Sequence, residues 1–362
     1  MARTADIYNY HAAIKANKNV SLFKLEDELN KVFAHPKNTP ESERDAEYYR
    51  RRRYSPNTFQ SYKSAVFNFV EWSGIENPFP TTATTIIEYL IDNKSLAPST
   101  LNHRVAALSF VHRALDFLDP TQNEVFKCKI RDVLGGIRKE HIEEKGWSEI
   151  QAPAINLCDF IVVLNSMGGS LIELRDKAFM LVSLLGAFRQ SEVLNLNVEH
   201  LIKKEQGYII PMGVVKNDQL SKHKKFKALP KLDNDSSIIC PVKALNIWIK
   251  KAKITSGPIF RGVLKSGEIR NNKLSHTSGN RIIKKRLSEG GIENADEYSC
   301  HSFRSTFITS LREADVSDAK IVRQTHHKNL ATLNIYDRPE VAFKNNPSLI
   351  LANEIKQLLI KK

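Results

Sequence analysis

Hydrophobic residues between positions 55 and 137 recur every three or four residues, which is the period of an amphipathic α-helix. Polar residues or prolines precede each run and favour a helix start there. We therefore predict an all-helical unit over residues 51–138, preceded by an N-terminal extension, residues 1–50. Its four helices are expected at residues 55–70, 82–91, 98–115 and 125–137.

The periodicity stops at residues 139–154, which are charged and contain Gly146 and Pro153, so we predict a linker there. In the second unit, residues 155–344, we expect helices at 158–167 and 171–188 and again from Pro241 onward. Strand-like runs lie between them at residues 208–210 and 226–229. The predicted fold is mainly α in two domains, with a small antiparallel sheet in the second.

The last segment, residues 345–362, carries an apolar stripe at helical spacing, formed by Leu351, Ile355, Leu358 and Leu359. A helix with such a stripe needs a surface to cover it, either on its own domain or on a second copy of the chain.

The net charge of the chain indicates what class of molecule it binds. The 362 residues have a formal net charge of +14 and a pI near 9.5, which favours a polyanion such as nucleic acid. Basic proteins are common, so charge supports this interpretation without establishing it. The chain has no apolar run of 18 residues and no secretion signal at its start, so we expect no membrane association and a cytoplasmic location, at the nucleoid in a bacterial or phage setting.

The sequence lacks the usual motifs of several metal-binding and phosphate-binding sites. The four cysteines are widely separated and form no zinc-binding spacing. We find no carboxylate cluster typical of a two-metal nuclease and no glycine-rich phosphate loop. The sequence therefore predicts neither a metal nor a cofactor.

Three short polar motifs in the second unit become informative as a set. Arg189 and Glu192 are three residues apart, on one face if a helix continues through them. His301-Ser302-Phe303-Arg304 places an imidazole and a guanidinium on the first turn of another expected helix. Further on, His327 precedes Tyr336 by nine positions. Each motif alone is more often a solvated surface.

In this order the motifs resemble the active-site signature of the tyrosine recombinases, the phage integrase family: Arg-x-x-Glu, His-x-x-Arg, His or Trp, and a nucleophilic Tyr. The resemblance extends from about residue 55 to the C-terminus. Within the family the chain is most similar to the Cre type, because residues 96–113 resemble the corresponding Cre helix. The resemblance implies a helical core-type DNA-binding domain followed by a catalytic domain.

The resemblance also implies a role for each residue of the set. Tyr336 would attack the phosphate, Arg189 and Arg304 would neutralise its charge, and His301 would share the phenolic proton. Glu192 would orient its neighbours without touching the phosphate, and His327 would donate to a non-bridging oxygen.

The family's general acid is a lysine in a hairpin between two strands, and Lys216 lies where it is expected. Other lysines crowd the same segment: Lys222, Lys224, Lys225 and Lys227.

Two positions depart from the family pattern. His326 stands where the family usually has Gly, and Thr325 replaces the usual Leu. The adjacent imidazoles leave open whether His326 or His327 contacts the phosphate, although the spacing to Tyr336 favours His327.

The implied partner is double-stranded DNA carrying a specific inverted-repeat site, bound by a homotetramer whose last helices dock into neighbouring protomers. A helix near residues 275–287 would present a polar stripe suited to the major groove. Similar contacts are possible from the helical unit, although all these residues can equally be solvated surface. The candidates are Thr277, Asn280, Arg281, Lys284, Thr100, Asn102 and His103.

Two other functions remain as alternatives to site-specific recombination through a 3′-phosphotyrosine and a Holliday junction. A type IB topoisomerase uses similar chemistry to relax supercoils without exchanging partners. A DNA-binding regulator could have kept the fold without catalysis. The Arg189–Glu192 motif and the Cre-like helix argue against the first, and the complete catalytic set argues against the second.

Overall fold

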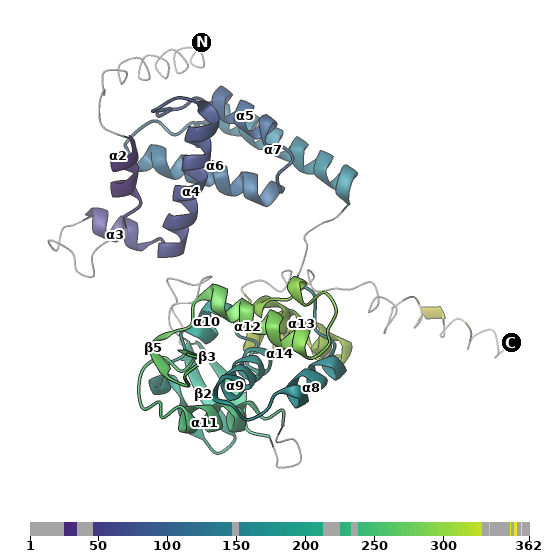
Figure 1. The fold of residues 1–362 in the computed structure, drawn as a ribbon. Coiled ribbons are helices and arrows are strands. Elements are labelled where there is room, and N and C mark those ends of the chain that lie inside the picture. The colour runs from purple at the N-terminus through teal and green to yellow at the C-terminus, as the bar shows by residue number, and fades with distance from the viewer. Residues whose placement is uncertain are drawn as a thin grey trace, which may run out of the picture. The chain divides into compact units, whose positions relative to one another are not determined.

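The computed structural model describes residues 25–34, 46–146, 152–212, 225–232, 238–327, 333, 348, 351, 352 and 356. The chain divides into two compact units, residues 1–149 and 150–362, coloured purple to blue and teal to yellow in Figure 1. Each unit has a hydrophobic core of its own.

The first unit is helical throughout its described part, as the periodicity predicted. Ser55 and Thr82 cap two of its helices by accepting hydrogen bonds from the amides of Thr58 and Thr85. The helices are α2 (Leu25–Val32), α3 (Ala46–Arg52), α4 (Pro56–Ser73), α5 (Ala83–Asp92), α6 (Pro98–Ala114) and α7 (Glu124–Lys145).

Aromatic rings fill the core of this unit. Phe69 is fully buried, and its ring centroid lies 5.1 Å from that of Tyr89, 5.7 Å from Trp72 and 5.9 Å from Phe79. Aromatic pairs at such distances add to the free energy already gained by burying their area. The apolar stripe of the sequence thus becomes a continuous aromatic cluster.

Helix α7 is longer than predicted and occupies half of the expected linker. It runs to Lys145 and ends at Gly146, whose positive φ of 73° suits glycine. Charged residues continue the helix beyond its apolar part, and Lys139 and Glu143 pair at 3.8 Å one turn apart. The missing apolar period was therefore a solvated helix end and not a coil.

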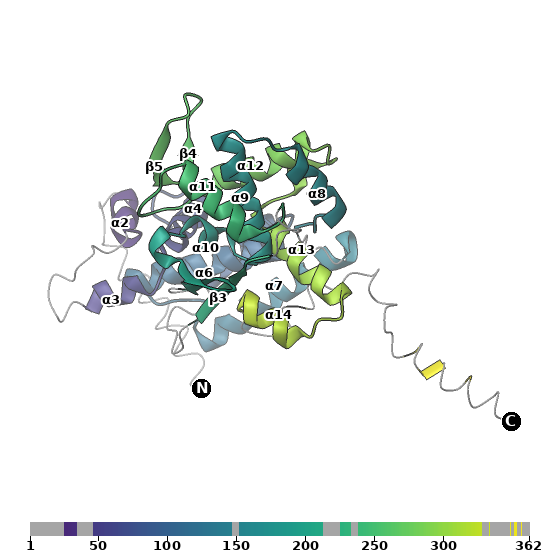
Figure 2. The ribbon, with the colours of Figure 1, turned by 90° about the horizontal axis from the view of Figure 1, so that it is seen from below.

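The second unit is built around α9 (Leu171–Leu185), most of which is buried. Helices α11 (Pro241–Lys251), α12 (His276–Glu289) and α13 (Cys300–Glu313) all pack against it, as Figures 1 and 2 show. The remaining helices are α8 (Leu157–Ser166), α10 (Gln190–Leu194) and α14 (Asp318–Thr325), with short 3-10 turns η2 (Val198–His200) and η4 (Ala295–Glu297).

A three-stranded antiparallel sheet completes this core, in the order β1 (Ile202–Lys204), β2 (Gly207–Met212), β3 (Lys225–Pro230). Both predicted strand segments lie within β2 and β3. In β3 the alternation turns Lys227 and Leu229 inward and leaves Phe226 exposed. Lys227 pairs in register with the buried Ile210.

A second, two-stranded sheet was not predicted. Strands β4 (Arg261–Val263) and β5 (Ile269–Lys273) form a hairpin where the sequence suggested only helices. Strand β5 carries four polar residues in succession, so it has no apolar alternation to reveal it. Gly267, with φ of 87°, makes the tight turn between the strands.

Candidate active site

Arg189 lies at the end of a turn between two helices, and Glu192 lies in the second of them. Helix α9 ends at Leu185, α10 begins five residues later, and Ala187 takes a left-handed φ of 46° between them. The Arg189 amide donates to Glu192 Oε2 at 2.9 Å, and its Nη1 donates to Oε1 at 2.8 Å. The predicted helix 171–188 is thus too long, and the Glu192 carboxylate caps a new helix whose N-cap residue is Arg189.

His301 is on the first turn of α13, as the sequence predicted, Arg304 begins the second turn, and Ser299 is the N-cap. The side chain of Arg304 is buried. Its Nη1 donates to the carbonyl of Ala187 at 2.7 Å, and its Nη2 donates to the carbonyl of Thr325. Arg304 therefore ties α13 to the Arg189 turn and to the end of α14.

His327 lies beside Arg304, with 3.2 Å between its Nε2 and the arginine Nη2. The Thr325 hydroxyl donates to the carbonyl of Ile321 at 2.9 Å, so its oxygen can accept the Nδ1 proton of His327 at the same distance. This places the lone pair of neutral His327 at Nε2, toward Arg304. Thr325, a departure from the family pattern, thereby fixes the tautomer of the histidine.

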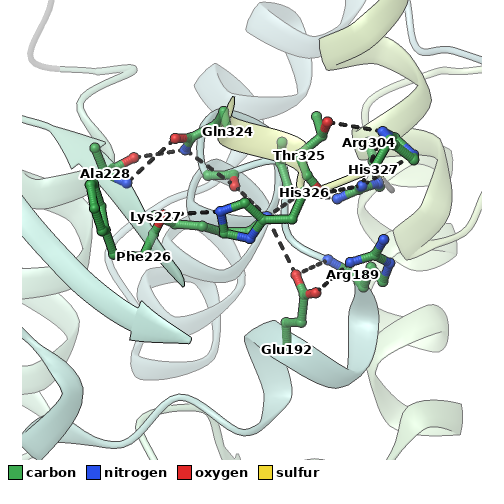
Figure 3. Close-up of polar contacts among 12 residues, drawn as sticks. Arg189, Glu192, Phe226, Lys227, Ala228, Arg304, Gln324, Thr325, His326 and His327 are labelled. Carbon is green, nitrogen blue, oxygen red and sulfur yellow. Dashed lines mark hydrogen bonds and ion pairs between the residues drawn. The ribbon is translucent and has the colours of Figure 1, made fainter. Parts of the chain in front are cut away.

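His326 points elsewhere and has a structural contact. It ends α14 in the left-handed region, with φ of 55°, where glycine is favoured. Its Nε2 bonds the carbonyl of Phe226 on β3 at 3.1 Å (Figure 3). Gln324 adds a second link, since its Nε2 donates to the carbonyl of Ala228 at 2.8 Å. Of the two adjacent imidazoles, His327 and not His326 is the one next to Arg304.

Lys227 is a member of this cluster that the sequence did not single out. Its fully buried Nζ lies 2.6 Å from the Ala187 carbonyl, 3.0 Å from that of Gly186, and 3.3 Å from Glu192 Oε2. Figure 3 shows Glu192 contacting both Arg189 and Lys227. The alternation of β3 was the available signal, because it places this lysine on the apolar face with Leu229.

Lys216 and Tyr336 lie outside the described residues. The nearest described residue before the tyrosine is Leu333, which is fully buried against Ile308 and Ile321. Arg312 donates from Nη1 to the Leu333 carbonyl at 3.0 Å and pairs through Nη2 with Asp318 at 2.8 Å. Helices α13 and α14 thus anchor the chain three residues before Tyr336.

Two site histidines are held neutral by their surroundings. Burial, followed by the charges of Arg304 and Arg189, lowers the pKa of His327 to about 3. Desolvation and then the same two guanidiniums lower the pKa of His301. His301 is exposed to solvent in this structure, and the two guanidiniums act on its imidazole there by repelling the protonated form. An anion placed among these groups would relieve that repulsion.

The buried carboxylate and amine stabilise each other. Burial raises the pKa of Glu192, but Lys227 and the hydrogen bonds from Arg189 outweigh it, and the pKa ends below its ordinary value. Burial lowers the pKa of Lys227 to about 7, against the opposing attraction of Glu192. Two basic side chains, Arg189 and Lys227, thus pair with a single carboxylate.

A family model now matches the part of the chain that holds this cluster. The phage integrase family model matches residues 160–342. The chain belongs to the phage integrase family. The integrase/recombinase XerD homolog of Selenomonas ruminantium is 32% identical over 295 residues, which are 80% of this chain and 84% of the relative. The tyrosine recombinase resemblance of the sequence is therefore confirmed.

Solved structures agree on the fold of this integrase family member. The Tn1549 transposon integrase in complex with transposon right-end DNA has a TM-score of 0.56 at 14% identity, over 91% of this chain and 99% of that one. The XerH site-specific recombinase bound to palindromic difH substrate also has a TM-score of 0.56, at 13% identity, over 85% and 82%. Membership of the Cre type stays a prediction.

The predicted DNA-reading stripe of α12 lies along one surface hollow, with Thr277 and Arg281 exposed and Asn280 and Lys284 half-buried. Asn280 Oδ1 accepts from Gln190 Nε2 at 3.0 Å and from the Cys300 amide at 3.1 Å. Its carboxamide oxygen is therefore engaged in joining α10, α12 and α13.

The candidates in the helical unit differ among themselves. Thr100 is exposed, and the Asn102 side chain donates back to the Pro98 carbonyl at 2.9 Å. His103 is half-buried against Tyr62, with ring centroids 5.1 Å apart. Asn102 and Tyr62 line a hollow with the basic residues Arg113, Lys127, Arg131 and Arg138.

Within the described ranges, no helix is long and apolar enough to cross a membrane. The same residues contain no group of three His, Cys, Asp or Glu side chains arranged to hold a metal ion.

Proposed function

We propose that this integrase family member is a site-specific recombinase that cleaves and rejoins duplex DNA through a 3′-phosphotyrosine, with Tyr336 as the nucleophile. One observation carries the proposal: separate elements bring the family's charged residues to one place. Arg189 comes from the turn before α10 and Glu192 from α10 itself, His301 and Arg304 come from α13, and His327 follows the end of α14.

Charge neutralisation falls to the two guanidiniums. Attack on a phosphodiester builds negative charge on the oxygens around phosphorus, and forked N–H donors stabilise it better than a point charge. Arg189 uses Nη1 on Glu192, and among the described residues its other guanidinium N–H groups have no partner. Arg304 is held by two backbone carbonyls and Arg189 by Glu192, so both guanidiniums are fixed before the phosphate binds.

The nucleophile needs a proton acceptor. A tyrosine pKa of about 10 makes ionisation at neutral pH cost roughly 4 kcal/mol. The lowered pKa of His301 keeps its imidazole neutral at that pH, which suits a group that accepts the phenolic proton. Tyr336 Oη then forms the bond to phosphorus as the bond to the 5′-oxygen breaks.

The leaving 5′-oxygen requires a proton, and we assign its donation to Lys216. The phosphotyrosine conserves the energy of the phosphodiester, so attack by a 5′-hydroxyl reverses each step without ATP and no cofactor is required. Two such exchanges pass through a Holliday junction. The amine nearest to the site among the described residues, Lys227, is fully buried, which argues against it as this donor.

His327 would complete the anion site. Burial and then the two guanidiniums lower its pKa to about 3, and a bound phosphate would offset the repulsion by the guanidiniums. The protonated ring could then donate from Nε2 to a non-bridging oxygen while Thr325 holds Nδ1. Glu192 would remain a support for Arg189 without touching the phosphate.

DNA as the partner agrees with the net charge of +14 and with the DNA complexes among the structural neighbours. We further propose an inverted-repeat site and a tetramer assembled on it. The apolar stripe that the sequence predicts within residues 345–362 supports the tetramer, and Leu351, its member in the described part of the chain, is 61% exposed. A protein–DNA complex that never exceeds the mass of a dimer would contradict the proposed tetramer.

The target can be found by covalent capture. The full chain is incubated with a duplex library that has a randomised central segment, in EDTA, and SDS-trapped protein–DNA adducts are sequenced. We expect one enriched site with an adduct at its 3′-phosphate. An absence of adducts would overturn the proposed activity and favour a DNA-binding regulator.

The selected duplex then tests the nucleophile and the reaction type. Tyr336→Phe should bind the duplex and form no adduct, and an adduct from this variant would overturn the assignment. Two copies of the site on one plasmid should yield recombinant products from the wild type. Relaxed plasmid without recombinants would instead indicate a topoisomerase.

A further inference from the structure

Lys227 is a buried cation that the proposed chemistry does not use. We propose that Lys227 is a positioning residue that holds the turn from Gly186 to Arg189 and so keeps Arg189 and Arg304 aimed at one phosphate. This inference rests on the proposed function. Its basis is the set of contacts of one Nζ, which lies within 3.3 Å of two backbone carbonyls and of Glu192.

The turn depends on side-chain donors. The carbonyls of Gly186 and Ala187 fall between α9 and α10. Within the described chain their hydrogen bonds come from Lys227, Arg304 and Gln324. The left-handed backbone at Ala187 costs free energy, so such a conformation persists only where its surroundings hold it.

Lys227 also connects the two arginines through shared acceptors. The Ala187 carbonyl accepts both from Lys227 Nζ, at 2.6 Å, and from Arg304 Nη1, at 2.7 Å. The Glu192 carboxylate pairs with Lys227 at 3.3 Å through one oxygen and with Arg189 at 2.8 Å through the other. Displacing the amine would therefore loosen both guanidiniums at once.

The same contacts argue that Lys227 acts through its neighbours and not on DNA. An ammonium has three N–H donors, and two carbonyls and a carboxylate surround this one. Its side chain is 0% exposed, and the Phe188 ring centroid lies 4.6 Å from Nζ. Burying a charge is costly, as the low pKa of Lys227 reflects, whereas a methionine would fill the space without that cost.

The test uses two forms of the selected duplex, one natural and one with sulphur in place of the 5′-bridging oxygen at the cleaved bond. A thiolate leaves without a proton because thiols are far more acidic than alcohols, so sulphur restores the rate lost with a general acid. It does not restore the rate lost with positioning. Single-turnover adduct formation is measured at saturating enzyme for Lys227→Met, Lys216→Ala and the exposed control Lys231→Met.

We expect Lys227→Met to slow adduct formation about 10- to 100-fold on both duplexes, since a misplacement near 1 Å has effects of that size. Lys216→Ala should recover on the sulphur duplex, and Lys231→Met should match the wild type. A wild-type rate for Lys227→Met overturns the inference, and so does its recovery on the sulphur duplex, which would make Lys227 the acid. Absence of wild-type adduct on either duplex would instead overturn the proposed function.

In Lys227→Met the buried Glu192 carboxylate loses the amine that pairs with it, and an unpaired buried charge destabilises the fold. A second variant therefore controls for misfolding. Lys227→Met/Glu192→Gln removes both charges and is compared with Glu192→Gln after circular dichroism shows that both are folded. We expect the double variant to be slower, because the two carbonyls have still lost a donor. Equal rates for the two would overturn the inference.

Discussion

The two units bury different kinds of side chain. In residues 25–146 the core is an aromatic cluster, the buried polar residues are the neutral Thr81, Ser109, His112 and Thr121, and one carboxylate side chain, that of Asp119, is buried beside Ser109 and Thr121. The second unit buries more charged side chains, among them Arg175, Asp176, Glu192, Lys227, Arg286 and Arg304. Aromatic burial stabilises through area, whereas a buried ion pair seldom does better than a well-packed apolar pair. The comparison indicates that the first core serves stability and the second also serves a site.

The largest expected effect is on the stability of the aromatic core. Phe69→Ala should lower the free energy of unfolding by about 3–5 kcal/mol, because it removes a fully buried ring and leaves a cavity. Urea unfolding followed by circular dichroism measures it, with Leu118→Ala, at a 56% exposed residue, as control. The adduct rate of folded protein should stay near the wild-type value. Loss of that rate would contradict the separation of the two cores.

For a charged residue of the second core, we expect the main effect on the rate of adduct formation and not on the free energy of unfolding. Arg304→Lys keeps the charge but loses the fork that reaches the Ala187 and Thr325 carbonyls. We expect single-turnover adduct formation to fall roughly 10²-fold, the size found for one lost transition-state donor. Arg323→Gln, on the exposed side of α14, is the control. A near-normal rate for Arg304→Lys would show that charge alone suffices.

A smaller effect is expected at the anchor before the nucleophile. Arg312→Met removes the donor to the Leu333 carbonyl and should slow adduct formation about 10-fold through poorer placement of Tyr336. Asp318→Asn weakens the ion pair but leaves that donor in place, so it should cost about 2-fold or less. Equal losses in the two variants would assign the effect to the ion pair and refute the anchor.

The smallest effect is on pH dependence. Burial first, and then Lys227, lower the folded-state pKa of His326 to about 4, against about 6.5 in the unfolded chain. The unfolded state thus binds the proton first, and stability falls as the pH drops from 6.5 toward 4. His326→Gly should reduce this acid slope in thermal denaturation and change stability little at pH 7, since glycine suits the φ of 55°.

His141→Gln, in the other unit, serves as the matched variant for that measurement. An unchanged acid slope in His326→Gly would contradict the assignment of His326. Some slope should remain in any case, because the pKa values of His301 and His327 are lowered in the same direction.

Local pattern was sufficient for most helices of the fold. Period and capping residues predicted α4, α5 and α6 within a few positions, since those signals lie within each helix. They failed at the end of α7, where the helix has no apolar face, and at the hairpin of β4 and β5. In the first place the sequence lacks the helical period of apolar residues, and in the second it lacks the strand alternation, on which such predictions depend.

The sequence by itself determined the family, through ordered motifs whose residues reflect the chemistry of phosphate. Tertiary structure alone decided how these residues cooperate. The alternation of β3 can place Lys227 on the apolar face, but only the tertiary structure brings it against Gly186 and Ala187. His326 differs from His327 only because β3 lies beside one and Arg304 beside the other. The physical reason is that burial and hydrogen-bond partners come from residues far apart in the chain, which no local pattern contains.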